Sequence, residues 1–425
     1  MKIQKILKRL LLLHPKSADL SLKRIKRLLK DLKNPEKKIL NAIQVVGTNG
    51  KYSFCSTLKE IFETAGYTVN LNTSPSIRRF NERFYFLGKY ISDDRLFNLL
   101  TEVEKINQGQ SITFHEFISA CFFLEAARNK ADINILEAGL FFRLDASNVL
   151  KKNIASVVMP IGIDHKDFLK KGTISEIVYE KCSHLPNNSK IFVSEQKKDV
   201  LKKIEKNIYK NSSKKFIFNR DYNHNKNTNG FFYNDFLGTI NLPVPNLKGD
   251  FQISNISTAI AVARSFKKFH ITENHIKKAV TSIKSEGRLQ SITKGKLRKY
   301  VFKNNKILVD GAHNTLAAYS IKKYLATLPK QKIIMILGMM ANKEHKKFIN
   351  ILKNSLHSII AVDIPNQVNF IPKEKLAKIA SSCKANAFVE GSIKKALEKA
   401  SRKNKNAIIF CTGSLYLAGE ILNLN

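Results

Sequence analysis

The stretch Val45-Val46-Gly47-Thr48-Asn49-Gly50-Lys51-Tyr52-Ser53 decides how the first part of this chain folds. It continues an apolar run that begins at Ala42, and a helix-compatible stretch follows from Ser53 to Ala65. A strand that leads through a glycine-containing turn into a helix gathers backbone N–H groups at the positive end of the helix dipole, where anions bind. The sequence therefore predicts a phosphate-binding turn on an α/β fold.

This turn departs from the common phosphate loop G-x-x-x-x-G-K-[ST]. Val45 stands where the first glycine is expected, and Tyr52 stands where that loop has Ser or Thr. Lys51 keeps the charge that contacts the outer phosphates of a nucleotide, and Ser53 offers a hydroxyl for Mg2+. We interpret the turn as a variant nucleotide-binding loop. The alternative is a tight strand–helix turn with a surface lysine.

Length and composition indicate a globular protein. The chain has 425 residues, of which 43% are hydrophobic, enough for two domains with substantial cores. Its five cysteines are scattered without a C-x-x-C pair, which is typical of a reducing compartment. The longest leading apolar run, Leu10 to Leu13, is too short for a signal sequence or a membrane span. We therefore expect a cytoplasmic protein with no membrane partner.

The net charge of +39 allows three interpretations. It fits drift in a Lys-rich proteome, attraction of acidic small molecules such as nucleotides and polycarboxylates, or binding to nucleic acid or anionic membranes. The lysines are spread along the whole chain, and no recognised nucleic-acid-binding motif occurs. We expect no specific nucleic-acid partner.

Short apolar runs alternate with helical patterns, which predicts two α/β domains. The N-terminal domain is predicted to be of the P-loop type, with a mostly parallel sheet flanked by helices. The smaller C-terminal domain is predicted to be Rossmann-like. The first forty residues are predicted to be amphipathic helix, the second helix covering about 20–32, and 219–238 is predicted to be hairpin or loop. We expect domains at 1–292 and 300–425, with a linker at 293–299. The predicted strands are 42–46, 68–71, 133–136, 155–159, 191–193, 307–309, 333–337, 359–362, 387–389 and 407–411.

Ligands of a parallel sheet collect beyond the carboxyl ends of its strands. Three segments that follow predicted strands therefore complement the turn: Asn72 to Pro75, Glu137 to Asn148, and Gly162 to Asp167. A Ser hydroxyl, a carboxylate and an imidazole, together with phosphate oxygens, would suffice for Mg2+. Taken alone, such a Glu is as often a helix N-terminal acid, and a lone His is more often structural. Their shared position favours a site.

With these motifs the chain resembles the bacterial folylpolyglutamate synthase / dihydrofolate synthase family, within the Mur-ligase superfamily, over nearly its full length. The family adds an amino acid to a carboxylate at the expense of ATP. The resemblance therefore implies a ligase that uses ATP, L-glutamate, and dihydropteroate or reduced folate. It rests on the G-T-N-G-K turn, Thr73-Ser74-Pro75, Asn81-Glu82-Arg83, Glu137-x-Gly139-Leu140, Arg143-Leu144-Asp145-Ala146, Asp164-His165, Glu180-Lys181, Gly287-Arg288, Asp310-Gly311-Ala312-His313-Asn314 and Gly413-Ser414.

The resemblance also implies site residues. Lys51, Lys181 and His165 are expected to be catalytic, and Lys181 matches the lysine that is carbamylated in this family. Two Mg2+ sites are expected from Ser53, Ser74, Glu137 and His165. The residues expected to bind ATP are Gly47, Thr48, Asn49, Gly50, Lys51, Tyr52, Ser53, Asn255, Arg288, Asp310 and His313.

The substrate side follows from further matches. The segment Leu13 to Leu22 resembles the one that contacts dihydropteroate in bifunctional members; the alternative is a helix N-cap at Ser17 or Asp19. The substrate residues expected are Asp19, Leu20, Thr113, Phe114, His115, Glu116, Arg143 and Asp145.

Two departures from the family pattern are expected to affect ligand fit. Tyr52 stands where the family has a Gly, and Phe141-Phe142 replaces a Gly-Gly pair on the substrate side. We expect an active, monomeric enzyme. The alternatives are a Mur-type ligase acting on another carboxylate and a basic nucleic-acid-binding ATPase.

Overall fold

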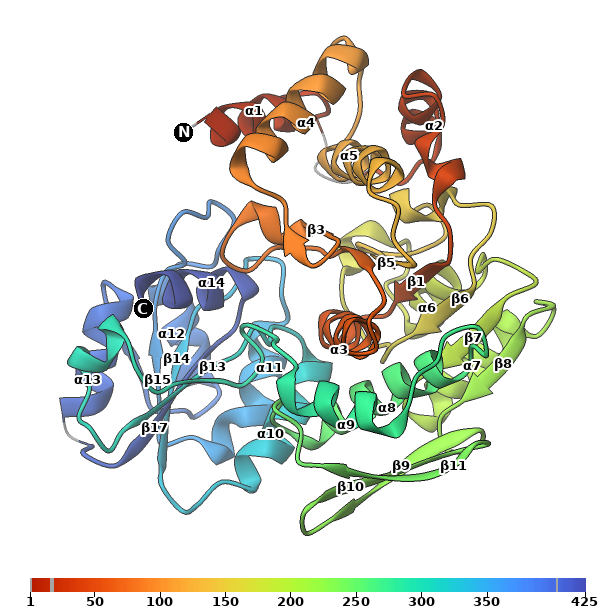
Figure 1. Cartoon of the computed structure of the whole chain (residues 1–425). Coiled ribbons are helices and arrows are strands. Elements are labelled where there is room, and N and C mark those ends of the chain that lie inside the picture. The colour runs from red at the N-terminus through yellow and green to blue at the C-terminus, as the bar shows by residue number, and fades with distance from the viewer. Residues whose placement is uncertain (1, 16–18, 403) are drawn as a thin grey trace. The chain divides into compact units, whose positions relative to one another are not determined.

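The computed structural model describes residues 2–15, 19–402 and 404–425 (Figure 1). Its contacts divide the chain into two units. The first comprises the residues up to 161, 168–246 and 253–283, and the second comprises 162–167, 247–252 and 284–425. The predicted fold class is confirmed, because each unit contains a parallel-dominated sheet with helices. The domain limits drawn from the sequence remain a prediction.

The first unit contains an eight-stranded sheet in the order β4-β3-β2-β5-β1-β6-β7-β8. All strand pairs from β2 to β8 are parallel, and β3 and β4 form an antiparallel edge. The central strands are buried along their whole length, which explains why most of their residues are apolar. The strands are β1 (Ala42–Val46), β2 (Val69–Asn72), β3 (Phe84–Phe86), β4 (Lys89–Tyr90), β5 (Ile133–Glu137), β6 (Ala155–Val158), β7 (Lys190–Val193) and β8 (Lys214–Ile217).

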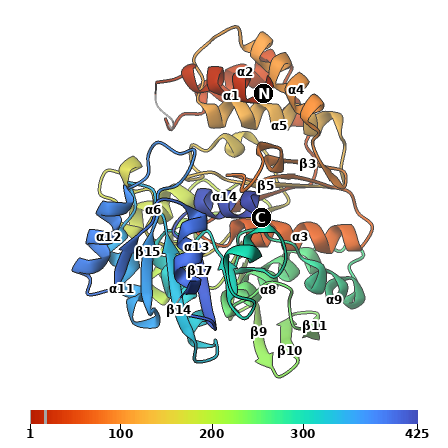
Figure 2. The ribbon, with the colours of Figure 1, turned by 90° about the vertical axis from the view of Figure 1, so that its left-hand side faces the viewer.

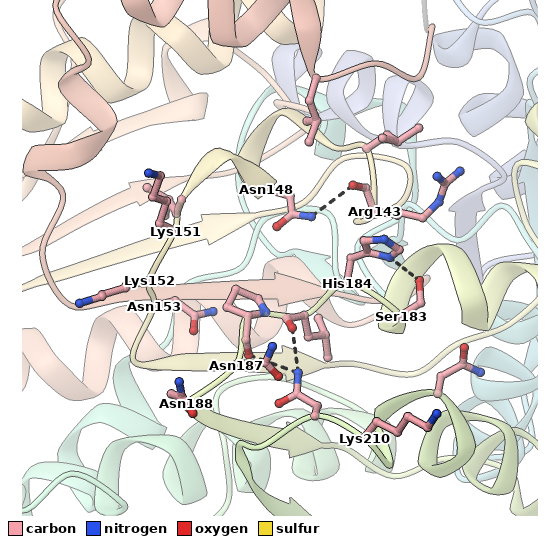
Figure 3. Close-up of a pocket in the computed structure, with 17 residues that line it drawn as sticks. Arg143, Asn148, Lys151, Lys152, Asn153, Ser183, His184, Asn187, Asn188 and Lys210 are labelled. Atoms are coloured by element: carbon pink, nitrogen blue, oxygen red, sulfur yellow. Dashed lines mark hydrogen bonds between the residues drawn. The ribbon is translucent and has the colours of Figure 1, made fainter.

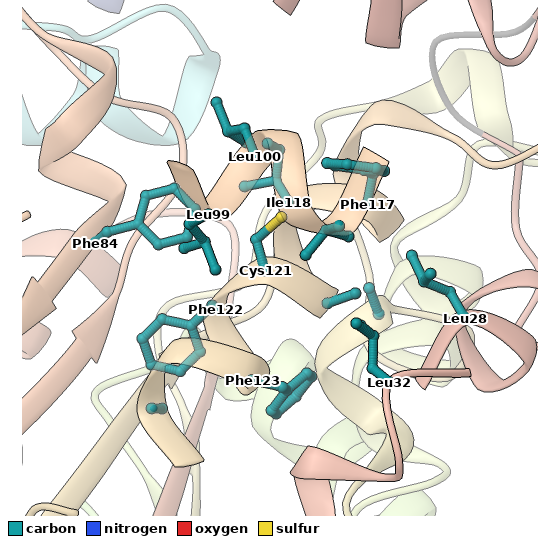
Figure 4. Packing of buried hydrophobic residues seen from close by; sticks show 14 of the residues in the cluster. Leu28, Leu32, Phe84, Leu99, Leu100, Phe117, Ile118, Cys121, Phe122 and Phe123 are labelled. Atoms are coloured by element: carbon teal, nitrogen blue, oxygen red, sulfur yellow. The ribbon is translucent and has the colours of Figure 1, made fainter. Parts of the chain in front are cut away.

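Four helices of this unit pack around one cluster of apolar side chains (Figure 4). Leu28, Leu99, Phe117 and Phe122 are all essentially inaccessible to solvent within it. The second helix begins at Lys23, three residues later than predicted. The helices are α1 (Lys2–Leu12), α2 (Lys23–Asp31), α3 (Lys51–Thr64), α4 (Asp93–Asn107), α5 (Phe114–Arg128), α6 (Ile174–Cys182), α7 (Lys198–Ile208), α8 (Asp250–Arg264) and α9 (Glu273–Ser282).

The segment predicted to be hairpin or loop lies within a separate antiparallel sheet. Its strands β9 (Tyr222–Asn227), β10 (Gly230–Asp235) and β11 (Gly238–Pro243) pair in the order β11-β10-β9. Tyr233 and Phe231 are fully buried, whereas the intervening Phe232 is exposed. This alternation, with a period of two, is typical of a sheet that buries one face.

The second unit has a six-stranded sheet in the order β12-β13-β17-β14-β15-β16, of which only the edge strand β12 runs antiparallel. Figure 2 shows β14, β15 and β17 with their helices. None of the helices in the described ranges has the length and apolar character needed to cross a bilayer. The elements are β12 (Gln290–Ile292), β13 (Lys306–Val309), β14 (Lys332–Leu337), β15 (Ser358–Ala361), β16 (Ala387–Val389), β17 (Ala407–Thr412), α10 (Thr315–Ala326), α11 (His345–Leu352), α12 (Lys373–Ser382), α13 (Ile393–Arg402) and α14 (Leu415–Leu424).

Candidate functional site

The predicted turn joins the central strand β1 to helix α3. Gly50 forms the N-cap of α3 with a left-handed φ of +81°. A Cβ atom at this position would lie 2.5 Å from Oδ1 of Asn255, a buried residue of α8. Only glycine therefore fits, both in backbone conformation and in space. The structure thus brings Asn255, a residue predicted to bind nucleotide, against the turn.

The backbone N–H groups of the turn fall into two sets. Those of Thr48 and Asn49 donate to the carbonyl oxygen of Pro160, at 2.9 and 3.2 Å. Gly50, Lys51 and Ser53 lie at the start of α3, where an α-helix leaves N–H groups without partners inside the helix. The backbone N–H groups available to an anion at this site are therefore those of the first helical turn of α3, and not those of Thr48 and Asn49. Tyr52, half-buried, is the second residue of the helix.

Lys51 and Glu137 face each other at the turn. Glu137 ends β5 and is 4% exposed, and its Oε1 lies 3.8 Å from Nζ of Lys51. The other carboxylate oxygen accepts a hydrogen bond of 3.0 Å from the backbone N–H of Ser74. The structure therefore brings together three predicted site residues from α3, β5 and the loop after β2.

Lys181 also reaches the turn, from α6. Its Nζ donates to the carbonyl oxygen of Gly47 at 3.0 Å and to that of Leu140 at 2.5 Å. Nζ of Lys51 lies 3.1 Å from the same Gly47 oxygen. Two ammonium groups and one carboxylate thus surround the N-terminus of α3. The excess of positive charge at a largely buried helix N-terminus favours an anionic ligand.

The two phenylalanines that replace a family Gly-Gly pair do not line an open surface. Phe141 and Phe142 are 1% and 0% exposed. Nζ of Lys181 lies 5.3 Å from the centroid of the Phe141 ring, within cation–π range. Both rings therefore pack inside this unit, Phe141 against Lys181, and their effect on substrate fit stays a prediction.

The four residues predicted to hold Mg2+ do not all belong to one unit. Ser53, Ser74 and Glu137 are in the first unit, whereas His165 lies in the segment Gly162–Asp167, which belongs to the second. Ser53 is 1% exposed in the first turn of α3. Within the described ranges, no three His, Cys, Asp or Glu side chains gather in a way that could hold a metal ion. A metal site formed by these residues would therefore also need serine hydroxyls and oxygens of a bound nucleotide.

Asp164 anchors the segment that carries His165 to the second unit. Its carboxylate contacts Nζ of Lys343 at 2.6 Å and Nε2 of His313 at 3.3 Å. It also accepts from the side-chain amide of Asn314 at 3.0 Å. Burial alone would raise the pKa of this carboxyl, but the hydrogen bond and charge of His313 and the charges of its other neighbours hold the pKa well below its usual range. The sequence motifs point to His313 but not to Lys343, which is one of 73 Lys and Arg residues and has no motif around it.

Asp310 follows β13 and organises another loop of the second unit. Its two oxygens accept from the N–H groups of Leu289 and Ala312, at 2.8 and 2.7 Å. Burial raises the pKa of this carboxyl despite the nearby charge of Arg288. The predicted nucleotide residues Arg288, Asp310 and His313 therefore belong to one unit, which is not the unit of the phosphate turn.

On the substrate side, Arg24 connects three predicted residues. Its guanidinium donates to the side chain of Asp19 at 2.8 Å and to the buried carboxylate of Glu116 at 2.9 Å. The same Glu116 oxygen accepts from the backbone N–H and the hydroxyl of Thr113, at 2.9 and 2.8 Å. Thr113 and Glu116 thus form the capping box that starts α5. Sequence analysis missed Arg24, which sits in a Lys/Arg-rich helix.

The remaining N-terminal residues are only partly described. Lys16, Ser17 and Ala18 lie outside the described residues, and with them the alternative N-cap at Ser17. Leu20 is half-buried, and Phe114 packs against the apolar cluster of the first unit.

His115 and Asp145 form a second pair on this side. Nε2 of His115 lies 3.3 Å from Oδ2 of Asp145, which also accepts from the N–H of Gly139 at 2.9 Å. The other Asp145 oxygen accepts from the hydroxyl and the N–H of Ser147. Burial opposes ionisation of this carboxyl, but the His115 charge and these hydrogen bonds lower its pKa. Asp145 is therefore a fixed, ionised group close to Gly139.

Arg143, also predicted to contact substrate, is held by a carboxylate of α6. Its Nε and terminal nitrogen donate to Glu180 over 2.9 to 3.1 Å, a forked arrangement. The backbone carbonyl of Glu180 in turn accepts from the N–H groups of Phe142 and Arg143. Glu180 therefore fixes the loop that carries Arg143 and leaves that guanidinium already neutralised.

The fold and the turn define a phosphate-loop α/β protein with a second α/β unit. The family profile described as "Dihydrofolate synthetase, C-terminal domain" matches residues 293–424. The folylpolyglutamate synthase of Lacticaseibacillus casei is 28% identical over 419 residues, 94% of this chain and 93% of that protein. The chain is thus similar, over nearly its full length, to folylpolyglutamate synthases and dihydrofolate synthases.

Two further relatives extend the comparison. The dihydrofolate synthase/folylpolyglutamate synthase of Buchnera aphidicola (subsp. Acyrthosiphon pisum) is 29% identical over 399 residues, 89% of this chain and 88% of that protein. The solved structure of Escherichia coli FolC in complex with DHPP and ADP matches with a TM-score of 0.88 at 24% identity, over 99% of this chain and 97% of that one. This structural match confirms the fold.

Proposed function

We propose that this protein is an ATP-dependent ligase that joins L-glutamate to dihydropteroate and to the glutamate tails of reduced folates. The observation that carries the proposal is the convergence of Lys51, Lys181 and Glu137 on the N-terminus of α3. The near full-length similarity to curated folate ligases supports the same activity.

The reaction follows from the poor electrophilicity of a carboxylate. An oxygen of the substrate carboxylate attacks the γ-phosphorus of ATP, the bond to the β-phosphate oxygen breaks, and ADP leaves. The glutamate nitrogen then attacks the carbonyl carbon of the acyl phosphate, loses a proton, and displaces inorganic phosphate as the amide forms. Catalysis of both steps consists mainly of positioning and charge neutralisation.

The residues of this chain suit these tasks. The N–H groups at the start of α3 and the ammonium of Lys51 would hold the phosphates, and Glu137 keeps Lys51 in place by its charge. Ser53, Ser74, Glu137 and His165 supply hydroxyl, carboxylate and imidazole ligands of the kinds that fit two Mg2+ ions. Mg2+ would neutralise the charge that develops on the transferred phosphoryl group. Asp19, Leu20, Thr113, His115, Arg143 and Asp145 are proposed to face the pterin side.

One assay tests the proposal. Purified protein receives ATP, Mg2+, L-glutamate and either dihydropteroate or tetrahydrofolate, and phosphate release and product mass are measured together. We expect phosphate release only with all components present, and a mass gain of one glutamyl residue per turnover. Phosphate release that does not require glutamate would contradict the proposal. The two pterin substrates, tested side by side, decide whether both activities are present. A monomeric, cytoplasmic enzyme without nucleic-acid partners remains a prediction.

A further inference from the structure

A hollow of about 990 Å3 lies in the first unit (Figure 3). Residues within 143–153, 183–188 and 207–211, together with Leu22, form its wall. The parts at 150–153, 183–188 and 207–211 directly precede β6, β7 and β8. The hollow therefore occupies the edge where these parallel strands begin, whereas the phosphate turn lies where β1 ends. We call it the tail hollow.

The wall of the tail hollow is cationic. Among its described residues there is no Asp or Glu, and four carry a permanent positive charge. Arg143 is already paired with Glu180. Lys151, Lys152 and Lys210 form no hydrogen bond or ion pair with any residue that the structure describes. Cations in a concave surface reinforce one another's field, so an anionic occupant would relieve their mutual repulsion.

Two side-chain amides add hydrogen-bond donors. Oδ1 of Asn187 accepts from the N–H of Ser212 at 3.3 Å, and Oδ1 of Asn188 accepts from the Ser212 hydroxyl at 2.8 Å. The amide oxygens are therefore engaged, whereas the two amide nitrogens have no partner among the described residues. Ammonium groups and amide N–H donors together suit carboxylates.

The composition of the wall also argues against other anions. A single strand of nucleic acid would need several aromatic side chains on which successive bases stack, whereas His184 carries the one aromatic ring among the described residues that line the tail hollow. Forked recognition of a phosphate by a guanidinium is not available here, because the guanidinium of Arg143 is already bound to a carboxylate. Separate lysines spread over a wide hollow instead fit an extended chain with several carboxylates.

The tail hollow shares its wall with the predicted pterin side. Arg143, Leu144 and Asn148 belong to the loop that also carries Asp145, and Leu22 follows the segment with Asp19. In the proposed reaction each turnover adds one carboxylate, so the substrate becomes longer and more anionic. Resting on this proposed function, we infer that the tail hollow binds the α-carboxylates of an extended γ-glutamyl chain.

The test uses the full-length protein and γ-pentaglutamate without a pterin. Binding is measured by calorimetry for the wild type and for a Lys151→Gln/Lys152→Gln/Lys210→Gln variant. We expect about tenfold weaker binding in the variant, because three ammonium–carboxylate contacts, each weak at an exposed surface, are lost together. A variant with Lys375→Gln, Lys378→Gln and Lys395→Gln, in α12 and α13, loses the same charge outside the tail hollow and should bind like the wild type. Equal weakening in both variants, or no binding by the wild type, would overturn the inference.

A second measurement separates the inference from the proposed function. The KM for a folate with three or more glutamates should rise in the tail-hollow variant, while the KM values for ATP and dihydropteroate stay unchanged. If the protein showed no ligase activity, the proposed function would be wrong. The pentaglutamate measurement would still test whether the tail hollow binds a γ-glutamyl chain. Retention of a single-stranded oligonucleotide in preference to pentaglutamate, with the same dependence on the three lysines, would overturn the assignment to a polycarboxylate.

Discussion

The ammonium group of Lys181 lies 3.0 Å from the carbonyl oxygen of Gly47, so a side chain of α6 holds the first residue of the phosphate turn. Lys51 approaches the same oxygen from the opposite end of the turn, at 3.1 Å. The backbone of the turn is thereby fixed by two lysines that are separated by 130 residues in the sequence. Each of them can be tested for a distinct role.

Lys181→Ala is expected to abolish ligation, and millimolar formate or acetate should restore part of it. The family resemblance implies that Lys181 is carbamylated, and a carbamylated lysine acts as a carboxylate. A small carboxylate from solution can enter the space that the shortened side chain leaves. The initial rate is measured with and without the added acid, and chloride serves as the control anion. Failure of the rescue would mean that the lysine works as an ammonium group that holds Gly47 and Leu140.

Lys51→Ala should lower kcat by at least about 100-fold, the usual effect of removing one group that stabilises developing charge. The side chain of Lys51 is only 12% exposed and lies 3.8 Å from the buried carboxylate of Glu137, so the unfolding midpoint should also fall. Activity is therefore compared at a temperature at which both proteins are folded. Lys59→Ala, two turns further along α3, removes the same charge from a lysine paired with Glu63 and should retain activity. Equal losses in both variants would show that the charge of α3, and not the position of Lys51, matters.

Gly50→Ala should lower the free energy of unfolding by about 1–3 kcal/mol and weaken ATP binding, because a Cβ at φ +81° is strained and meets Asn255 at 2.5 Å. Gly66→Ala is the matched control, since Gly66 has φ +85° and nothing within 4 Å of the added atom. Urea unfolding and nucleotide titration are measured for both. The difference between the two variants isolates the steric contact with Asn255 from backbone strain.

The sequence predicted the central strands because a buried parallel strand consists mostly of apolar residues, as β1 and β5 do. It missed β3 and β4, which have three and two residues and carry no periodic signal. It also missed β8, which begins with two lysines. The antiparallel sheet of 222–243 is rich in Asn, a residue that also marks loops.

The site residues, like the strands, could be predicted where the local sequence carries a signal. Glu137 and Lys51 lie next to strand ends, so their proximity could be predicted from local order. The partner of Arg24 is Glu116, 92 residues away, and nothing in the sequence distinguishes this arginine from its basic neighbours. The placement of His165 in the second unit likewise depends on distant contacts, those of Asp164 with His313 and Lys343.

Arg24→Met should raise the KM for dihydropteroate while the KM for ATP stays unchanged. The variant leaves the carboxylates of Asp19 and Glu116 without their shared cation, and Glu116 is only 4% exposed. A loss of about 2 kcal/mol in unfolding free energy is expected from the missing charged hydrogen bonds. Arg9→Met removes an exposed bridge to Glu104 and should change neither quantity appreciably. A uniform fall in kcat with unchanged KM values would argue against a positioning role.

The free energy of unfolding of Asp145→Asn should fall less steeply towards acid pH than that of the wild type. The pKa of Asp145 is lowered in the folded protein, so its ionised form contributes stability above the pKa of the unfolded chain, about 4. This contribution declines as the pH falls from about 5 towards the lower folded-state pKa. In urea titrations between pH 6 and pH 3.5, the gap in unfolding free energy between wild type and Asp145→Asn should therefore shrink as the pH falls. Asp94→Asn, at an exposed acid for which the structure shows no ion pair within its described residues, is the control and should change the free energy of unfolding only slightly. If the gap in unfolding free energy between wild type and Asp145→Asn widened towards acid pH, burial, and not the pairing with His115 and Ser147, would dominate the pKa of the carboxyl.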